Sequence, residues 1–269
     1  MKRKVVILGC GSSCGVPRPN QDWGNCDPSE PKNRRRRSSI LIEQYSPNDL
    51  NNKTSIIIDT SADFSHQLID TSVKEISAVI YTHAHADHTH GIDDLRSFAL
   101  AQKNKIPIYA EKQTLEILNR TFGYCFKTPH GSNYPPILEA NEIFFDQEFN
   151  ISGKGGEISF IPFIQPHGSI NSVGLRIGKD FAYCTDISAV NQYIMEHIAQ
   201  VDTLIIDALQ YKPHPSHLSV SEVLNVVEIV KPNKVYLTHM HNTLDYVTLK
   251  KELPSFIEPA YDNLSIELI

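Results

Sequence analysis

A dense group of histidines and acids follows a short apolar run in the first third of the chain. The run, residues 78–81, is typical of a buried strand, and the sequence after Thr82 reads His83-Ala84-His85-Ala86-Asp87-His88. Three imidazoles and a carboxylate so close together are costly to bury unless they bind a partner. Because alternate side chains of an extended chain point to the same side, His83 and His85 can share one cation. Asp87 and His88 follow where the chain turns, and they can face a second cation.

The donor atoms of this group limit which metal the chain would hold. They are nitrogens and carboxylate oxygens without a cysteine, which suits zinc, manganese or iron and leaves coordination positions open to water. Two neighbouring cations that share a water lower its pKa from about 15.7 toward ~7, so hydroxide exists at neutral pH. The pattern therefore predicts metal-assisted hydrolysis, with Asp87 placed to orient the hydroxide as well as to bind metal.

Length and charge narrow the class of protein further. The 269 residues are 41% hydrophobic and 21% charged, which is a globular composition, and we expect residues 1–269 to form a single domain. The net charge of −6 counts against nucleic acid as the partner. Apolar runs are too short for a membrane span of ~20 residues or for a signal peptide, so neither is expected. The cysteines are odd in number and scattered, which favours a reducing, cytoplasmic location: Cys10, Cys14, Cys26, Cys125 and Cys184.

Short apolar runs alternate with helical patterns along the chain, each run bounded by Gly, Pro, Asn or Asp. Strands are expected at residues 4–8, 39–43, 55–59, 78–81, 106–110, 157–163, 172–177, 181–184, 203–207, 234–237 and 264–268. Helices are expected at 62–69, 92–103, 113–122, 190–198, 220–230 and 244–252, with Ser219 or Ser221 capping the fifth. Residues 124–141 are expected to form a long irregular loop. This order favours two mixed sheets packed together with helices outside.

The sequence from His83 to His88 resembles the His-x-His-x-Asp-His signature of the metallo-β-lactamase fold hydrolases, which also follows a strand. Further residues match the later motifs of that family in order and at expected strand ends: Asp59 in Ile57-Ile58-Asp59, His167 in Gln165-Pro166-His167, Asp186 in Cys184-Thr185-Asp186 and His239 in Leu237-Thr238-His239. The resemblance implies an α/β fold, a four-layer αββα sandwich of two mixed sheets flanked by helices.

The same resemblance implies two divalent metal ions per chain, zinc or manganese or else iron. One ion would be held by His83, His85 and His167, and the other by Asp87, His88 and His239. Asp186 would bridge the two ions. Asp59 would support the metal ligands from behind them.

Within that fold, the chain is most similar to the phosphoribosyl cyclic phosphate phosphodiesterase group. The likeness is carried by residues 9–17, 33–39, 91–96 and 237–246. It implies that His217, just before a helix, protonates the leaving alcohol of a small cyclic or nucleotide-like phosphate ester, and it also implies a homodimer. His214, in Pro213-His214-Pro215, is either solvated or part of the site, and Arg96 either contacts substrate or pairs with Asp93 or Asp94.

One part of the chain departs from that group, whose members often carry a structural zinc bound by Cys-x-Cys-x-x-Cys and a histidine. Three of these four ligands are missing, because the corresponding residues are Gln21, Trp23, Cys26 and Asn242. We therefore expect no zinc at this position. A metal bound by His241 together with Cys10, Cys14 or Cys26 stays open as an alternative.

The consecutive arginines Arg34, Arg35, Arg36 and Arg37 have two interpretations of equal weight. Some of them bind phosphate, or they keep a face soluble and form interface ion pairs. Alternate residues of an extended segment point in opposite directions, so at most two of the four can face one site.

The leading hypothesis is a dinuclear hydrolase that cleaves a phosphodiester by metal-bound hydroxide, with His217 as the general acid. Other hydrolases of the same fold remain alternatives: a nuclease acting on RNA or tRNA ends, or an enzyme that hydrolyses a thioester or a β-lactam. A degenerate binding module would lack some ligands, whereas all seven expected positions are filled here.

Overall fold

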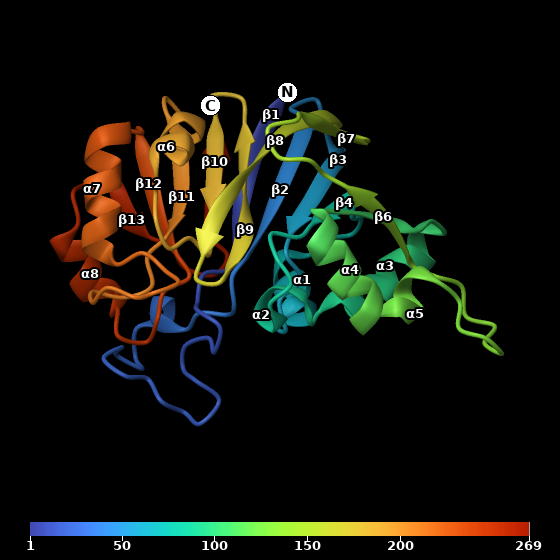
Figure 1. Ribbon diagram of the computed structural model, residues 1–269, viewed down its shortest axis with the longest axis horizontal. Helices are drawn as coiled ribbons and strands as arrows, with labels where there is room; N and C mark the ends of the chain where they lie inside the picture. Colours follow the sequence, from blue (N-terminus) through green and yellow to red (C-terminus); the bar gives the residue numbers. More distant parts are fainter. Residues whose placement is uncertain (269) are drawn as a thin grey trace.

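The first strand, β1 (Lys2–Gly9), is apolar on both of its faces. Val5 and Ile7 contribute to one buried hydrophobic cluster, whereas Val6 and Leu8 contribute to another. A strand of this kind has to be covered on both sides, because neither face tolerates water. The computed structural model, which describes residues 1–268, provides this cover with a second sheet on one side and helices on the other (Figure 1).

Each of the two sheets has seven strands. The first sheet has the order β14 (Ser265–Leu268), β1, β2 (Ser39–Ser46), β3 (Asp49–Ile58), β4 (Ala78–Ile80), β5 (Ile106–Ala110) and β6 (Leu138–Glu142). The second has the order β13 (Ile257–Pro259), β12 (Lys234–Thr238), β11 (Thr203–Asp207), β10 (Phe181–Cys184), β9 (Ile170–Ile177), β8 (Gly156–His167) and β7 (Phe149–Gly153). Both sheets are mixed, since strands β3 to β6 and β10 to β13 pair in parallel and the other neighbours pair antiparallel.

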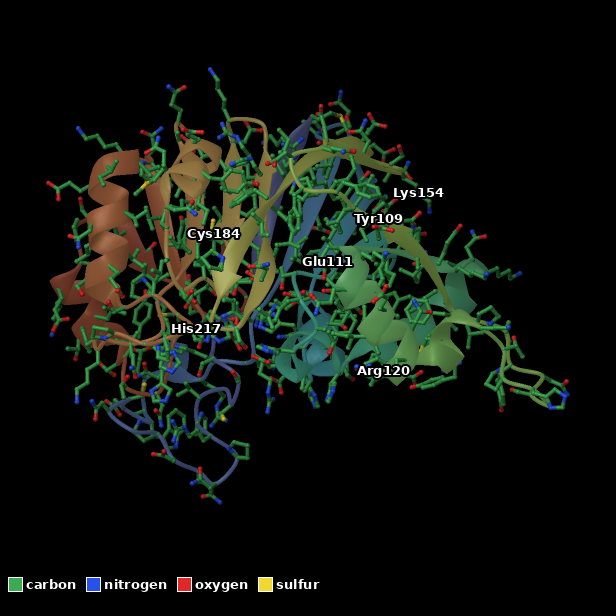
Figure 2. The ribbon with its side chains drawn as sticks, viewed as in Figure 1. Tyr109, Glu111, Arg120, Lys154, Cys184 and His217 are labelled. Atoms are coloured by element: carbon green, nitrogen blue, oxygen red, sulfur yellow. The ribbon has the colours of Figure 1, made fainter. Side chains whose placement is uncertain are left out.

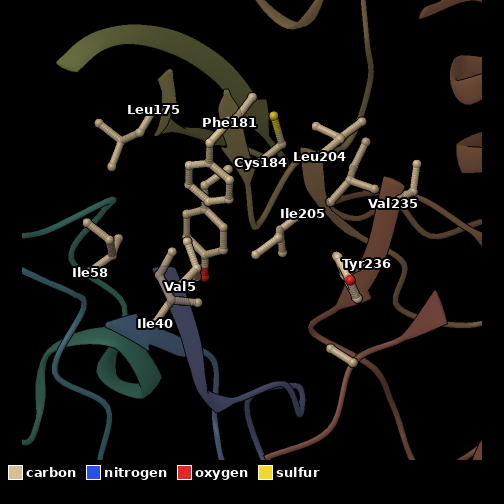
Figure 3. Packing of buried hydrophobic residues seen from close by; sticks show 14 of the residues in the cluster. Val5, Ile40, Ile58, Leu175, Phe181, Cys184, Leu204, Ile205, Val235 and Tyr236 are labelled. Carbon is tan, nitrogen blue, oxygen red and sulfur yellow. The ribbon is translucent and has the colours of Figure 1, made fainter. Parts of the chain in front are cut away.

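Helices cover the outer face of each sheet. The first sheet packs against α1 (Phe64–Thr71), α3 (Leu95–Gln102) and α4 (Lys112–Thr121), and the second against α6 (Gln192–Ile198), α7 (Val220–Val230) and α8 (Tyr246–Glu252). Between the sheets, residues such as Ile40 and Ile58 lie opposite Leu175 and Ile205 (Figure 3). The arrangement is the expected αββα sandwich. None of the helices within residues 1–268 is both long and apolar enough to cross a membrane.

The strand directions bring many strand ends to one edge of the sandwich. Strands β3 and β4 run parallel, as do β10, β11 and β12. Strand β8 runs with β10, because β9 lies between them and is antiparallel to both. We call the edge where these strands end the carboxyl edge. Ligand sites of open α/β sheets lie at this kind of edge, in the crevice outside the carboxyl ends of the strands.

The sequence-based prediction was wrong for residues 124–141. The short helix α5 (Gly123–Phe126) and strand β6 occupy both ends of that segment. Strands β7 and β13 and the one-turn helix α2 (Ala86–Thr89) were also not expected. The three missed strands each lie at an edge of a sheet. Only the first residue of β6 is buried, so its sequence carries no apolar alternation to recognise.

Candidate metal centre

Three histidines from two sheets converge at the carboxyl edge. His83 and His85 follow β4, and His167 is the last residue of β8. One ring nitrogen from each of the three lies within 4.8 Å of the others. The Nε2 atom of His167 is 3.3 Å from Nδ1 of His85. The Oδ2 atom of Asp186, which follows β10, is 3.9 Å from Nε2 of His83 and 3.5 Å from Nε2 of His167.

A second group lies on the other side of Asp186. It consists of Asp87 and His88, at the start of α2, and His239, which follows β12. The Oδ1 atom of Asp186 is 3.2 Å from both Nε2 of His88 and Nδ1 of His239. The Oδ2 atom of Asp87 is 3.4 Å from Nε2 of His88. The two oxygens of Asp186 therefore face two different sets of ligand atoms.

Several nitrogen atoms of this cluster are buried without a hydrogen-bond partner. They are Nε2 of His83, of His88 and of His239. A buried polar atom left in this way destabilises the fold by about 1–3 kcal/mol. A divalent cation among these atoms would accept their lone pairs, so the residues present fit a metal ion.

Three of the histidines have the neutral form that metal binding needs. Burial lowers the pKa of His83, His167 and His239, which leaves these imidazoles neutral near pH 7. Burial also acts to lower the pKa of His88, but the carboxylates around it outweigh burial and raise that pKa well above its ordinary value. Without metal, His88 therefore holds a proton, which a bound cation would displace.

In three of these histidines, the Nδ1 atom contacts a further group. Asp59 Oδ2 lies 2.7 Å from Nδ1 of His88, and Asp59 Oδ1 accepts a hydrogen bond of 2.8 Å from the amide of Thr82. Nδ1 of His83 lies 3.0 Å from the hydroxyl of Thr82, and Nδ1 of His167 lies 2.7 Å from the carbonyl of Ser216. Contacts of this kind set the orientation and tautomer of metal-binding histidines.

Three site residues adopt a left-handed backbone conformation that is uncommon for residues other than glycine. The φ angles are 64° at Asp59, 52° at Asp186 and 56° at His239. All three come directly after the last residue of a strand or one residue later. Backbone in a sparsely populated region costs of order 1–3 kcal/mol per residue and is concentrated at functional sites. Here it turns each side chain from the strand direction toward the cluster.

His217 lies beside the cluster. Its Nδ1 atom is 2.7 Å from Oδ2 of Asp207, the last residue of β11. Its ring is 4.8 Å from that of His167, measured between centroids. Figure 2 shows His217 at the carboxyl edge.

Comparison with known proteins identifies the family. The family described as "Beta-lactamase superfamily domain" matches residues 54–240. The chain belongs to the β-lactamase superfamily. A crystal structure described as a new diphosphatase from the PhnP family is 32% identical to this superfamily member, with a TM-score of 0.87 over 99% of this chain and 97% of that chain.

More distant solved structures show the metallo-β-lactamase fold alone. Zinc-bound PqqB from Methylobacterium extorquens has a TM-score of 0.73 at 18% identity, over 98% of this chain and 99% of that one. The short form of human tRNase Z has a TM-score of 0.63 at 17% identity, over 98% of each chain.

A curated relative is also similar to this superfamily member. It is an octanoyltransferase from Porphyromonas gingivalis (strain ATCC BAA-308 / W83), 28% identical over 264 residues. The match covers 97% of this chain and 51% of the relative, so the chain spans about half the length of that protein.

Asp207 was missed as a site residue in the sequence analysis. It is fully buried, and burial raises its pKa well above the ordinary value, although its Oδ2 atom contacts His217. The available signal was its position, since Asp59 and Asp186 also occur at the ends of strands. A second missed contact is Ser38, whose Oγ lies 3.1 Å from Nδ1 of His239.

Two residues that the sequence indicated as site candidates lie outside the cluster. His214 is exposed, with its ring centroid 5.4 Å from that of His217. Arg96 lies on α3, where its guanidinium is 2.6 Å from Oδ1 of Asp93. Of the two contacts expected for Arg96, the structure contains the acidic pair.

The cysteines considered for an extra metal do not gather around His241. Cys26 donates to backbone carbonyls of Asn242 and Leu244 at 3.4 Å, and Cys10 contacts the carbonyl of Ala260 at 3.4 Å. Cys14 is exposed. His241 instead contacts the guanidinium of Arg18. Among residues 1–268, these residues form no group of three metal-binding side chains.

Proposed function

We propose that this chain is a dinuclear metal-dependent hydrolase that cleaves a phosphodiester in a small cyclic or nucleotide-like phosphate ester. The observation that carries this proposal is the position of Asp186, whose two carboxylate oxygens face separate sets of ligand atoms. The similarity to a PhnP-family diphosphatase supports a phosphate ester as the substrate class.

The residues divide between two cation positions. His83, His85 and His167 would hold one ion, and Asp87, His88 and His239 the other, with Asp186 contacting both. Cations bound there would supply acidity to a bound water and charge stabilisation to the phosphoryl oxygens. Asp87 is the more open of the two carboxylate ligands, with 11% of its side chain exposed against 2% for Asp186, so we assign it to orient the attacking water.

The leaving alcohol needs a proton, which we assign to His217. Asp207 holds Nδ1 of His217 at 2.7 Å, so Nε2 is the nitrogen left to face the substrate. The contact with Asp207 fixes the orientation of the ring, and burial lowers the pKa of His217, so that its protonated form gives up a proton readily. General acids of this kind contribute about 10²- to 10⁴-fold to the rate.

Metal analysis of the purified protein, combined with a phosphodiester assay and metal add-back, tests this function. We expect two divalent ions per chain and activity that disappears on chelation and returns with metal. Asp186→Asn should lose bound metal and activity together. Asp180→Asn is the matched control, because Asp180 lies before β10 at the opposite edge and pairs with Arg3. Fully metallated wild type without phosphodiesterase activity contradicts the proposal.

Thioester hydrolysis is the second candidate function. It is favoured by the name of the curated relative, since an octanoyltransferase acts on an acyl group. Zinc or another divalent ion would polarise a thioester carbonyl by the same chemistry. Parallel assays of one preparation on bis(p-nitrophenyl) phosphate, an octanoyl thioester and a β-lactam separate these reactions. A kcat/KM that is highest for the thioester replaces the first proposal with the second.

A further inference from the structure

Cys14 is the exposed cysteine of this chain. The other four are buried, with at most 3% of their surface exposed: Cys10, Cys26, Cys125 and Cys184. A reagent in solution can therefore reach the sulfur of Cys14 while the protein stays folded, whereas the packed structure shields the other sulfurs.

Cys14 lies at the tip of a tight turn. The amide of Gly15 donates a hydrogen bond of 2.7 Å to the carbonyl of Ser12, so Ser13 and Cys14 are the central residues of this turn. Gly15 has a φ angle of 68°, a left-handed conformation that glycine adopts without strain. The turn holds the side chain of Cys14 out of the core.

Both ends of the turn are fixed beside the metal centre. Before it, the amide of Ser12 donates to the carbonyl of Met240 at 3.1 Å, and Met240 directly follows His239. After it, Val16 and Arg35 exchange two backbone hydrogen bonds of 2.8 Å. The turn belongs to the blue segment between β1 and β2, which lies at the carboxyl edge in Figure 1. The turn therefore has a defined position near the residues proposed to bind metal.

Cys14 lines a cavity of about 460 Å³ together with a group of arginines. We call this cavity the arginine pocket, and the charged residues that line it are Arg18, Arg34, Arg35, Arg36, Arg37 and Asp63. Arg37 contacts the turn directly, because its Nε atom donates to the carbonyl of Ser13 at 2.9 Å. Five cationic side chains and one carboxylate thus border the same cavity as Cys14.

Two of these arginines lack a counter-ion. Arg34 and Arg35 form no ion pair with a carboxylate among residues 1–268. Arg34 is exposed, with its guanidinium over the ring of Trp23. Arg35 is 1% exposed, and its Nε atom is buried without a hydrogen-bond partner. A buried guanidinium without a counter-ion is destabilising, so this wall of the arginine pocket favours an anionic group independently of the cysteine.

We propose that Cys14 is a modification site at which an anionic disulfide, of the class of oxidised glutathione, forms a reversible mixed disulfide. Reactive cysteines occur in electropositive, solvent-accessible surroundings, and both conditions hold at Cys14. Each half of oxidised glutathione carries two carboxylates and one ammonium group, so its net charge is negative and complements the arginine pocket.

The reaction is a thiol–disulfide exchange. The sulfur of Cys14 loses its proton to solvent and attacks one sulfur of the disulfide. A bond forms between these two sulfurs, the original S–S bond breaks, and the second glutathione leaves as a thiolate with the electron pair. Cys14 is oxidised, and the departing half is reduced. An added thiol reverses the exchange by the same steps.

The modification should also control activity, a part of the proposal that rests on the proposed function. A tripeptide attached at Cys14 occupies the arginine pocket beside the metal centre. Its carboxylates repel a phosphate diester, and its bulk narrows the approach to the metal ligands. We therefore expect the modified protein to lose phosphodiesterase activity and a thiol to restore it.

Mass spectrometry of the folded protein after incubation with oxidised glutathione tests the site. Wild type should gain one glutathionyl group, mapped to Cys14 and removed by dithiothreitol, whereas Cys14→Ser should gain none. Arg34→Gln should slow the modification about 5-fold, because it removes one cation near the site. The same variant should react with the neutral bis(2-hydroxyethyl) disulfide at the wild-type rate. Arg120→Gln, on the exposed surface of α4 and away from His217 in Figure 2, is the matched control and should react like wild type.

The outcomes that overturn the proposal are distinct. Folded wild type that gains no adduct, or gains it on a buried cysteine, overturns the modification site. Arg34→Gln that reacts at the wild-type rate, or that slows equally with both disulfides, overturns the preference for an anionic disulfide. Unchanged hydrolysis of bis(p-nitrophenyl) phosphate by fully modified protein overturns the control of activity, for which Cys14→Ser should be active and insensitive to oxidised glutathione. An unmodified enzyme inactive on this ester contradicts the proposed function, and the mass measurement still decides the modification.

Discussion

The rings of His217 and His239 stack with centroids 4.7 Å apart and planes inclined by 12°. This contact places the proposed proton donor against a proposed metal ligand. The Nδ1 atoms of the two rings contact different partners, Asp207 for His217 and Ser38 for His239. Proton donation and metal binding are therefore assigned to adjacent imidazoles that can be changed separately.

Replacement of His217 by alanine should affect substrates according to their leaving groups. An alkyl alcohol needs a proton as it departs, whereas p-nitrophenolate does not. We expect His217→Ala to lower kcat for an alkyl phosphodiester by about 10²- to 10⁴-fold and kcat for a p-nitrophenyl diester far less. His214→Ala is the control, because His214 is exposed nearby. An equal loss for both leaving groups, or loss of bound metal from His217→Ala, removes His217 from this role.

The buried contact between Asp59 and His88 should influence metal affinity without supplying a ligand. The carboxylate of Asp59 orients His88 and makes its Nε2 atom a stronger electron-pair donor to the metal. Asp59→Asn removes this charge. We expect the affinity for the weaker-bound ion to fall about 10- to 100-fold, measured by competition with a chromogenic chelator. Asp70→Asn, which changes an exposed aspartate, should match wild type. Unaltered affinity in Asp59→Asn indicates that the contact serves folding alone.

Removal of metal should lower the thermal stability of the protein. Without cations, the carboxylates of Asp87 and Asp186 repel each other, and the buried histidine nitrogens lack partners. At a cation concentration about 1,000 times the Kd, binding stabilises the fold by about 4 kcal/mol. For a chain of this size, EDTA should then lower the Tm by roughly 10 °C, reversibly on metal addition. A scan that EDTA leaves unchanged shows that the cluster is stable without metal.

Asp262 should make stability decrease as pH rises. Burial raises the pKa of Asp262 to about 7, and hydrogen bonding from the amide of Arg36 only partly offsets burial. A carboxyl group whose pKa is raised in the folded state favours folding fully at a pH below its unfolded pKa near 4. This contribution to the free energy of unfolding is lost as the pH rises toward 7. Asp262→Asn should therefore gain stability relative to wild type at pH 8, by up to about 4 kcal/mol, with little difference at pH 4. Denaturation of both proteins at the two pH values measures this. A constant difference between them assigns the residue another role.

The sequence predicted the central strands and the cluster of residues at their ends because both signals are local. Strands such as β5, β10 and β11 were predicted with the bounds that the structure has, since their apolar residues are continuous and turn residues flank them. Helix α7 was predicted with its bounds as well. Its start is set by the capping box of Ser219 and Glu222, which selects Ser219 over Ser221.

Three of the four edge strands and the long-range contacts were not predicted from the sequence. Strands β6, β7 and β13 lie at sheet edges, and the side chains of β6 show no apolar period for this reason. The pair of Asp207 with His217 joins residues ten positions apart through a turn whose path only the packed sheets define.

The sequence by itself determined which groups can bind metal, because its imidazoles and carboxylates directly follow apolar runs that form strands. Sheet pairing decided which of these groups meet. It set the two oxygens of Asp186 toward different partners and brought Ser38 beside His239. The physical reason is that a local pattern determines which way a side chain points along its own strand. The distance between side chains of different strands depends on hydrogen bonding and packing across the whole sandwich.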